Sequence, residues 1–229
     1  MDMNVTQAIL SRKSVRAYTN KTIDESEIIA LLEKASRSPS GGNLQPWRIF
    51  TLDSQRMKHF LEFQKNYLDE HVPDYSIYPD DLSEPYNTSR KLVGEMMYSL
   101  LNISREDKDA RIQQVLKNFT FFDAPSALFC FIDKCMGPPQ WSDLGMFLQS
   151  FMLLAQEKGL STCAQEAWSL RAKMVRSYFG ISDSFILFCG TSIGYEDTSH
   201  PINQLKTQRQ PLSEWVNPSF IDERLNNDN

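Results

Sequence analysis

A short run of basic and hydroxyl side chains near the N-terminus has residue types that could do chemistry. It consists of Ser11, Arg12, Lys13, Ser14 and Arg16. The planar guanidinium of arginine offers a fork of donors that matches a phosphate, and lysine and serine add shorter-range donors. Short charged runs are also typical of a solvated surface turn. On its own, the run is therefore either one side of a phosphate site or an exposed turn.

A second basic cluster, Lys206 with Arg209, lies near the other end of the chain. The chain as a whole is acidic, with 24 Lys and Arg against 29 Asp and Glu, a formal net charge of −5 and a pI of about 5.3. General nucleic-acid and anionic-membrane surfaces need a net basic face. We therefore expect no nucleic-acid or membrane partner, and the two local basic clusters stand out against this background.

A polar loop rich in glycine spans Ser38–Trp47. Its glycines allow the backbone to approach a flat ligand closely, and its amide side chains both donate and accept hydrogen bonds. The residues concerned are Gly41, Gly42, Asn43 and Gln45. Taken alone, the loop could equally be a plain connection.

Hydrophobic periodicity and capping signals predict the elements that must position these residues. We expect helices near residues 4–10, 24–38, 54–68, 88–101, 107–116, 143–159 and 171–179. We expect strands at 47–52, 126–133 and 185–189, with an extended piece at 160–168. The helix over 143–159 is apolar nearly all round, which indicates a central core helix or one that packs across a subunit interface.

Residues 54–120 are the least regular part of the chain, with prolines and tyrosines between the expected helices. Loops this long are usually functional or disordered, and the aromatic content argues against disorder. The segment is either an elaboration that covers a pocket or a structural excursion. Four aromatic residues could line such a pocket or pack in the core, namely Tyr98, Phe119, Phe121 and Phe122.

Several common classes of site are missing from the sequence. There is no G-x-G-x-x-G, P-loop or G-x-S-x-G motif, which disfavours a nicotinamide-binding fold, an NTPase or a serine hydrolase. The four cysteines form no C-x-x-C pair and the three histidines have no metal-ligand spacing, so we expect no metal. No signal peptide or membrane span is evident, and we expect a cytoplasmic protein.

Taken together, the motifs resemble the FMN-dependent nitroreductase family. Four segments in order carry the resemblance: residues 12–16, residues 38–47, the helix 143–159 running into 160–166, and residues 190–195 with 206–212. The resemblance implies an α/β fold with a mixed, mainly antiparallel central sheet and helices on both faces. It also implies an intertwined homodimer with flavins at the interface. We expect one domain over 1–229, with a variable lid at about 54–120 and a C-terminal arm at about 200–229.

The resemblance implies a role for each matching residue. Contacts to the phosphate, ribityl chain and pyrimidine of FMN are implied for Arg12, Lys13, Ser14 and Arg16. A second phosphate clamp is implied for Arg209 and Lys206. The loop that reaches the flavin from the other protomer corresponds to Pro39, Ser40, Gly41, Asn43 and Gln45. The segment along the flavin edge corresponds to Ala164, Gln165 and Glu166, with the Glu166 backbone N–H directed at flavin N5. The family often has proline at the Ala164 position, so the local backbone is less restrained here.

The implied activity is that of an FMN oxidoreductase. It would take hydride from NADH or NADPH and pass electrons to a nitroaromatic, quinone or related small acceptor in alternating half-reactions. Two cation clusters suit the dianionic phosphate, and the hydride chemistry belongs to the cofactor, so no catalytic side chain is required. The alternatives are a reductive dehalogenase or other specialised flavin reductase, and a non-enzymatic flavin binder. The Glu, Tyr and Lys spacing of the deiodinase lid is not found in 54–120.

Overall fold

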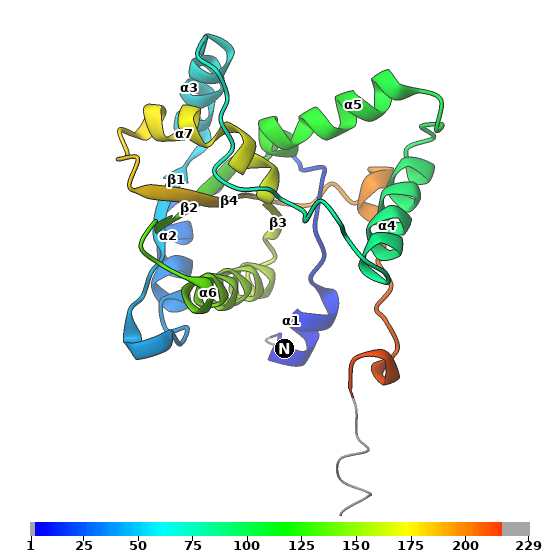
Figure 1. Cartoon of the computed structure of the whole chain (residues 1–229), viewed down its shortest axis with the longest axis horizontal. Coiled ribbons are helices and arrows are strands. Elements are labelled where there is room, and N and C mark those ends of the chain that lie inside the picture. Colours follow the sequence, from blue (N-terminus) through cyan, green and yellow to red (C-terminus); the bar gives the residue numbers. More distant parts are fainter. Residues whose placement is uncertain (1–2, 217–229) are drawn as a thin grey trace, which may run out of the picture.

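A four-stranded sheet forms the centre of the fold (Figure 1). The computed structural model describes residues 3–216. The strands are β1 (Arg48–Leu52), β2 (Ser126–Asp133), β3 (Ser161–Gln165) and β4 (Phe185–Gly194), in the spatial order β1-β2-β4-β3 with every pair antiparallel. An isolated parallel bridge joins Ser14 to Thr162 of β3. The expected mixed, mainly antiparallel sheet is confirmed.

Seven α-helices and five short 3-10 turns connect and cover the strands within residues 3–216. The helices are α1 (Val5–Ser11), α2 (Glu25–Ala35), α3 (Ser54–Lys65), α4 (Tyr86–Leu100), α5 (Lys108–Leu116), α6 (Pro138–Glu157) and α7 (Ala172–Phe179). The turns are η1 (Gly41–Asn43), η2 (Lys117–Asp123), η3 (Glu166–Arg171), η4 (Pro201–Gln204) and η5 (Leu212–Glu214). No helix in the described part of the chain is long and apolar enough to span a membrane. The portion of the expected C-terminal arm from residue 217 onward lies outside the described residues.

Helices cover both faces of the sheet, as expected. Helices α2 and α6 lie on one face, and α3 and α7 lie on the other (Figure 1). Strand β2 shows why both faces need cover. Its alternate residues Phe129 and Phe131 pack into the core under α3 and α7, whereas Leu128 and Cys130 pack into the core beside α6. A strand buried on both sides is continuously apolar, as this one is.

Strand β4 is longer than the predicted strand, which ended at Cys189. Instead, β4 continues through small residues to Gly194 between β2 and β3. A side chain at Gly190 would clash with the indole of Trp168, and one at Gly194 would clash with the ring of Tyr18. Glycine within a strand often marks such a close approach rather than a strand end.

Helix α6 begins at Pro138, five residues before the predicted start at Asp143. Pro138 and Pro139 occupy the first helical turn, where the missing N–H costs no internal hydrogen bond. Asp143 therefore does not cap the helix but lies buried within it. The predicted C-terminal end is confirmed, since Gly159 follows the helix with a φ of 72°.

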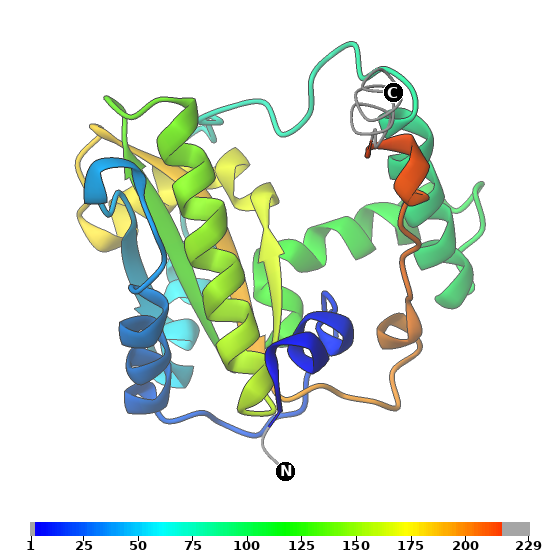
Figure 2. The ribbon, with the colours of Figure 1, turned by 90° about the horizontal axis from the view of Figure 1, so that it is seen from below.

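The segment 54–120 divides into two parts that are built differently. Helix α3 belongs to the core, because Met57 and Phe60 are buried against the sheet. Helices α4 and α5 stand away from the sheet (Figures 1 and 2). Helix α4 buries no residue, and α5 buries only Gln114 among its described residues. We call the stretch Tyr86–Leu116 the α4–α5 excursion.

Candidate functional site

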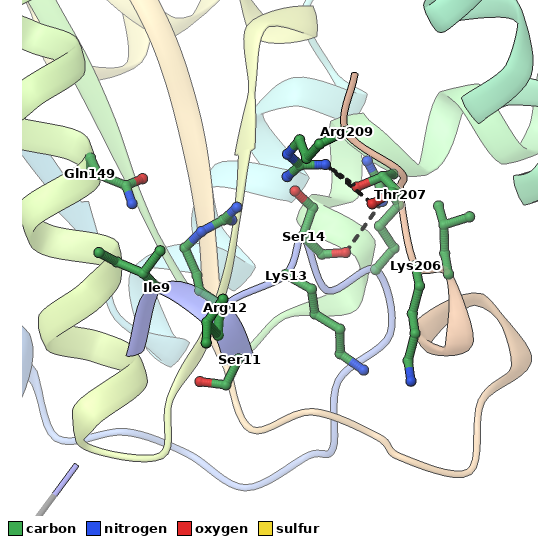
Figure 3. Close-up of a pocket in the computed structure, with 12 residues that line it drawn as sticks. Ile9, Ser11, Arg12, Lys13, Ser14, Gln149, Lys206, Thr207 and Arg209 are labelled. Carbon is green, nitrogen blue, oxygen red and sulfur yellow. Dashed lines mark hydrogen bonds between the residues drawn. The ribbon is translucent and has the colours of Figure 1, made fainter. Parts of the chain in front are cut away.

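The two basic clusters from opposite ends of the chain line one cavity of about 730 Å³ (Figure 3). Its walls include every basic residue predicted to hold the phosphate: Arg12, Lys13, Arg16, Lys206 and Arg209. The hydroxyls of Ser11, Ser14 and Thr207 and the amide of Gln149 from α6 complete its polar lining. The side chains of Arg12 and Arg209 extend toward the same region, whereas those of Lys13 and Lys206 extend away from it (Figure 3).

Local structure explains how the N-terminal cluster reaches the cavity. A capping box between Asn4 and Gln7 starts α1, which ends at Ser11 directly before the first arginine. The chain then becomes extended, and the Val15 N–H donates to the Thr162 carbonyl at 3.1 Å. Successive side chains of an extended chain point to opposite sides. Burial of Val15 therefore leaves the flanking residues 14 and 16 on the cavity side.

Lys13 is held by the protein itself. Its Nζ lies 2.7 Å from Oε1 of Glu196 and 2.6 Å from the backbone oxygen of Asn203. In contrast, the guanidinium of Arg12 forms no hydrogen bond or ion pair with any residue in 3–216, and only its backbone N–H is used, donating to the Ala8 carbonyl at 3.0 Å. Of the two neighbouring cations, Arg12 is the one that is free to meet an anion.

Asn203 was missed by the sequence reasoning. It is 2 % exposed, and its Oδ1 accepts the Arg16 N–H at 2.9 Å. Its Nδ2 donates to the carbonyls of Ala17 and Asp197, each at 2.8 Å. The only local signal was its position three residues before Lys206, which does not reveal a partner near residue 16.

A thiol lies beneath the N-terminal cluster. Burial raises the pKa of Cys163, while Arg16, a hydrogen bond with Ser14 and Arg12 act in the opposite direction. The thiol is therefore neutral at physiological pH and serves as a small apolar group in the core.

The predicted flavin-edge segment borders the same region. Thr162 uses its carbonyl to bind Val15, on the side of β3 that faces away from β4. Backbone groups alternate along a strand, so Ala164 also presents its N–H and C=O on that free edge. Ala164 is exposed there. The edge that begins at the basic cluster is thus open at the position expected to meet the flavin.

The next two residues differ in their environments. Gln165 is 3 % exposed, and its Nε2 donates to the Asn118 carbonyl at 2.8 Å, while its Oε1 has no partner within residues 3–216. Glu166 is exposed, but partial desolvation raises the pKa of its carboxyl. The carboxyl therefore takes up a proton more readily than an ordinary glutamate.

The predicted loop with Pro39, Ser40, Gly41, Asn43 and Gln45 is not part of this cavity in the single chain. It lies beside the N-terminal half of α6, whereas α1 lies beside the C-terminal half (Figure 2). The buried carboxylate of Asp143 accepts the Gly41 N–H at 3.2 Å, and Ser40 Oγ accepts the Gln45 N–H at 3.0 Å. Gly42, Asn43 and Gln45 all have left-handed backbones. These hydrogen bonds fix the conformation of the loop, but the loop does not line the cavity formed by the basic clusters of the same chain.

The aromatic candidates also separate. Phe119, Phe121 and Phe122 are buried and pack in the core around Trp168. Tyr98 of α4 lies under the guanidinium of Arg111, 4.1 Å from the ring centroid. For the three phenylalanines, the core interpretation is therefore the correct one.

The arrangement fits a phosphorylated flavin. Cations from two distant segments converge on one cavity in a chain of net charge −5. Like charges gathered in this way repel unless an anion joins them. Ala164 on the neighbouring edge of β3 is exposed, and the residues that line the cavity match the donor set that a phosphate requires.

Comparison with known proteins agrees with the fold. The profile of the Nitroreductase family matches residues 9–195, and the chain belongs to this family. It is 33% identical over 205 residues to 4-nitrobenzoate reductase of Pseudomonas putida, covering 88% of this chain and 89% of that protein.

Two solved structures are similar over nearly their whole length. The FMN and NADPH-dependent nitroreductase NfnB from Sphigopyxis sp. strain HMH is 39% identical, with a TM-score of 0.87 over 93% of this chain and 98% of that chain. The FMN-dependent nitroreductase NfnB from Mycobacterium smegmatis, solved with NADPH, shares the fold at 24% identity and a TM-score of 0.83. That alignment covers 93% of this chain and 99% of the other.

Proposed function

We propose that this protein is an FMN-dependent oxidoreductase that takes hydride from NADH or NADPH and reduces nitroaromatic compounds. The observation that carries the proposal is the convergence of Arg12, Arg16, Lys206 and Arg209 on one cavity beside the open edge of β3. Relatives named as nitrobenzoate and nitrobenzene reductases support a nitroaromatic acceptor. Quinones and related acceptors fit the same site by their flat shape.

The chain's own residues would bind and orient the cofactor. Arg12 and Arg209 would neutralise the phosphate, and Ser14 would add a hydroxyl donor. Arg16 would lie nearer the ring, where a cation favours the reduced anionic form. The bound flavin supplies hydride acceptance and donation. The backbone from Ala164 to Glu166 would lie along its edge, with the Glu166 N–H as a donor.

Surface features support a homodimer. Val5, Ile9 and Leu10 of α1 are 71%, 51% and 80% exposed, and Met146 of α6 is 39% exposed. Such an apolar surface suits a subunit interface. A second copy would also bring the shaped loop Pro39–Gln45 to the flavin, since a chain's own loop lies away from its own cavity.

We also propose roles for two further segments. The α4–α5 excursion would act as a lid over the acceptor, and the arm after residue 200 would contribute Lys206 and Arg209. The four free cysteines, Cys130, Cys135, Cys163 and Cys189, suit a reducing cytoplasm.

An anaerobic spectroscopic experiment tests the activity. The flavin-loaded protein is mixed first with NADH or NADPH, and then with 4-nitrobenzoate. We expect the flavin absorbance to bleach with the nicotinamide and to return with the nitro compound. A protein that holds flavin but is not bleached by either nicotinamide would be a flavin binder without this activity. Release of halide from a halogenated aromatic, without turnover of nitro compounds, would favour the dehalogenase alternative.

A further inference from the structure

We propose that Asn203 is a positioning residue that holds the two basic clusters in register around the phosphate cavity. This inference rests on the proposed function, because it concerns how the chain prepares for the phosphate of FMN. Asn203 does not line the cavity itself and so would act only through its neighbours.

The side chain of Asn203 is almost fully used by long-range hydrogen bonds. Its Oδ1 accepts the backbone N–H of Arg16 at 2.9 Å, across 187 positions of sequence. Its Nδ2 donates one bond to Ala17 O and one to Asp197 O, each at 2.8 Å. An amide has two donors and an acceptor oxygen, so both N–H groups are satisfied. At 2 % exposure, water cannot replace these bonds.

The backbone of Asn203 adds a second connection to the N-terminal cluster. Its carbonyl accepts the Lys13 ammonium at 2.6 Å, and the same ammonium is paired with Glu196 at 2.7 Å. Asn203 therefore binds the N-terminal segment at two points: its backbone carbonyl accepts from Lys13, and its side chain accepts from the Arg16 N–H. The two guanidinium groups of that segment, Arg12 and Arg16, belong to residues next to or at these anchor points.

The same residue fixes the start of the C-terminal cluster. It lies in η4 between Ile202 and Leu205, which are 1 % and 6 % exposed and bury the turn in the core. Lys206 follows directly after Leu205. Beyond it, the hydrogen bonds of the Arg209 side chain go only to Thr207 and Gln208 within the described residues. The placement of this cluster therefore depends on the anchored turn before it.

A simple packing role would give the same contacts but a different binding phenotype. Riboflavin has the ring and ribityl chain of FMN but lacks the phosphate. If Asn203 positions the phosphate cations, its loss weakens FMN binding by a clearly larger factor than riboflavin binding, in which only the contact of Arg16 near the ring is involved. If it only maintains the fold, both flavins are affected alike.

The test measures the affinity of flavin-free full-length protein for FMN and for riboflavin by fluorescence titration. For Asn203→Ala, we expect FMN to bind about tenfold more weakly, the loss typical of a buried hydrogen-bonding group. Riboflavin affinity should change by less than about twofold, because riboflavin has no phosphate for the displaced cations to bind. Should Asn203→Ala not accumulate as folded protein, Asn203→Ser provides the same comparison with a smaller polar group.

Gln204→Ala is the matched control, since this neighbour in η4 is exposed and bonds only to the Thr198 carbonyl among residues 3–216. It should leave both affinities unchanged. The positioning role is overturned if the Asn203 variants weaken both flavins equally or neither. If the parent protein itself does not prefer FMN over riboflavin, the proposed function fails instead, which separates the two ideas.

Discussion

The phosphate cavity and the α4–α5 excursion are built in opposite ways. Around the cavity, the segment that follows α1 is tied to β3 by Val15 and to η4 by Asn203, and the residues at both anchors are buried. In the excursion, α4 has no buried residue, and its side-chain contacts include exposed pairs such as Arg105–Glu95. The first region is fixed by buried long-range hydrogen bonds, whereas α4 buries no side chain even where it contacts η4.

This difference suggests a division of labour. A bound cofactor needs preorganised charges. A region that admits varied acceptors must change shape easily, which requires few buried contacts. We infer that the cavity determines which cofactor binds. We also infer that the α4–α5 excursion determines which electron acceptors are admitted.

The largest effect is expected from removing one arginine of each cluster. In the double variant Arg12→Ala with Arg209→Ala, FMN affinity should fall by at least about a hundredfold, because each charge-assisted contact contributes roughly 1.5–3 kcal/mol. Arg12→Ala or Arg16→Ala alone should weaken retention markedly with the dimer still folded. Equilibrium dialysis of FMN measures this.

Arg105→Ala is the control, since this cation lies in the excursion with a side chain 74% exposed. It should retain FMN as the parent protein does. If the double variant retains FMN as well as the parent protein does, residues 11–16 form an exposed surface turn and not a phosphate site.

A second contrast lies within the predicted lid itself. Phe60 of α3 is fully buried and contacts Phe121, Phe129 and Trp168. Phe60→Ala should lower the free energy of unfolding by about 3–5 kcal/mol, the usual cost of such a cavity. Leu92→Ala in α4, where the side chain is 47% exposed, should change it by no more than about 0.5 kcal/mol. Urea unfolding would measure both changes. Equal losses of unfolding free energy in the two variants would contradict the division of residues 54–120 into a core helix, α3, and a weakly buried excursion.

Amide hydrogen exchange should separate the two regions directly. Amides of α4 should exchange faster than those of β2, because weakly buried helices open at lower free-energy cost than core strands. Adding FMN should slow exchange at residues 13–17 more than in α4. Equal protection of α4 and β2 in the free protein would show that the excursion is as firmly held as the core.

The smallest effect concerns the predicted flavin edge. Desolvation raises the pKa of Glu166 above its usual 4.5, so the folded state binds a proton more readily than the unfolded state does. This group therefore costs stability as pH rises above that usual value. In flavin-free protein, Glu166→Gln should be slightly more stable than the parent at about pH 7, with the difference vanishing near about pH 4. Thermal unfolding at both pH values measures the difference, and an effect that is independent of pH would exclude desolvation as its cause.

Much of the site could be predicted from sequence because its signals are local. Residue types at 12–16 and 206–209 predict anion binding wherever they lie, and the apolar run of β2 predicts a buried strand at its observed bounds. The convergence of the two clusters could only be inferred from family resemblance. Its physical cause is the pair of bonds from Asn203 to residues 16 and 17, which no local pattern reveals.

The errors have equally specific causes. The start of α6 was misplaced because prolines usually end helices, yet Pro138 and Pro139 fit the first turn. The sequence predicts an end of β4 that is too early, because Gly190 and Gly194 resemble the small residues that commonly follow a strand. Their real role depends on aromatic rings from distant segments, at Trp168 and Tyr18.

A crystal structure of the protein with FMN would test the central claim most directly. We predict the phosphate within hydrogen-bonding distance of both Arg12 and Arg209, and the ring along the backbone from Ala164 to Glu166. The loop Pro39–Gln45 near that ring should come from the other subunit. A phosphate held away from the two basic clusters would contradict this account of the cavity.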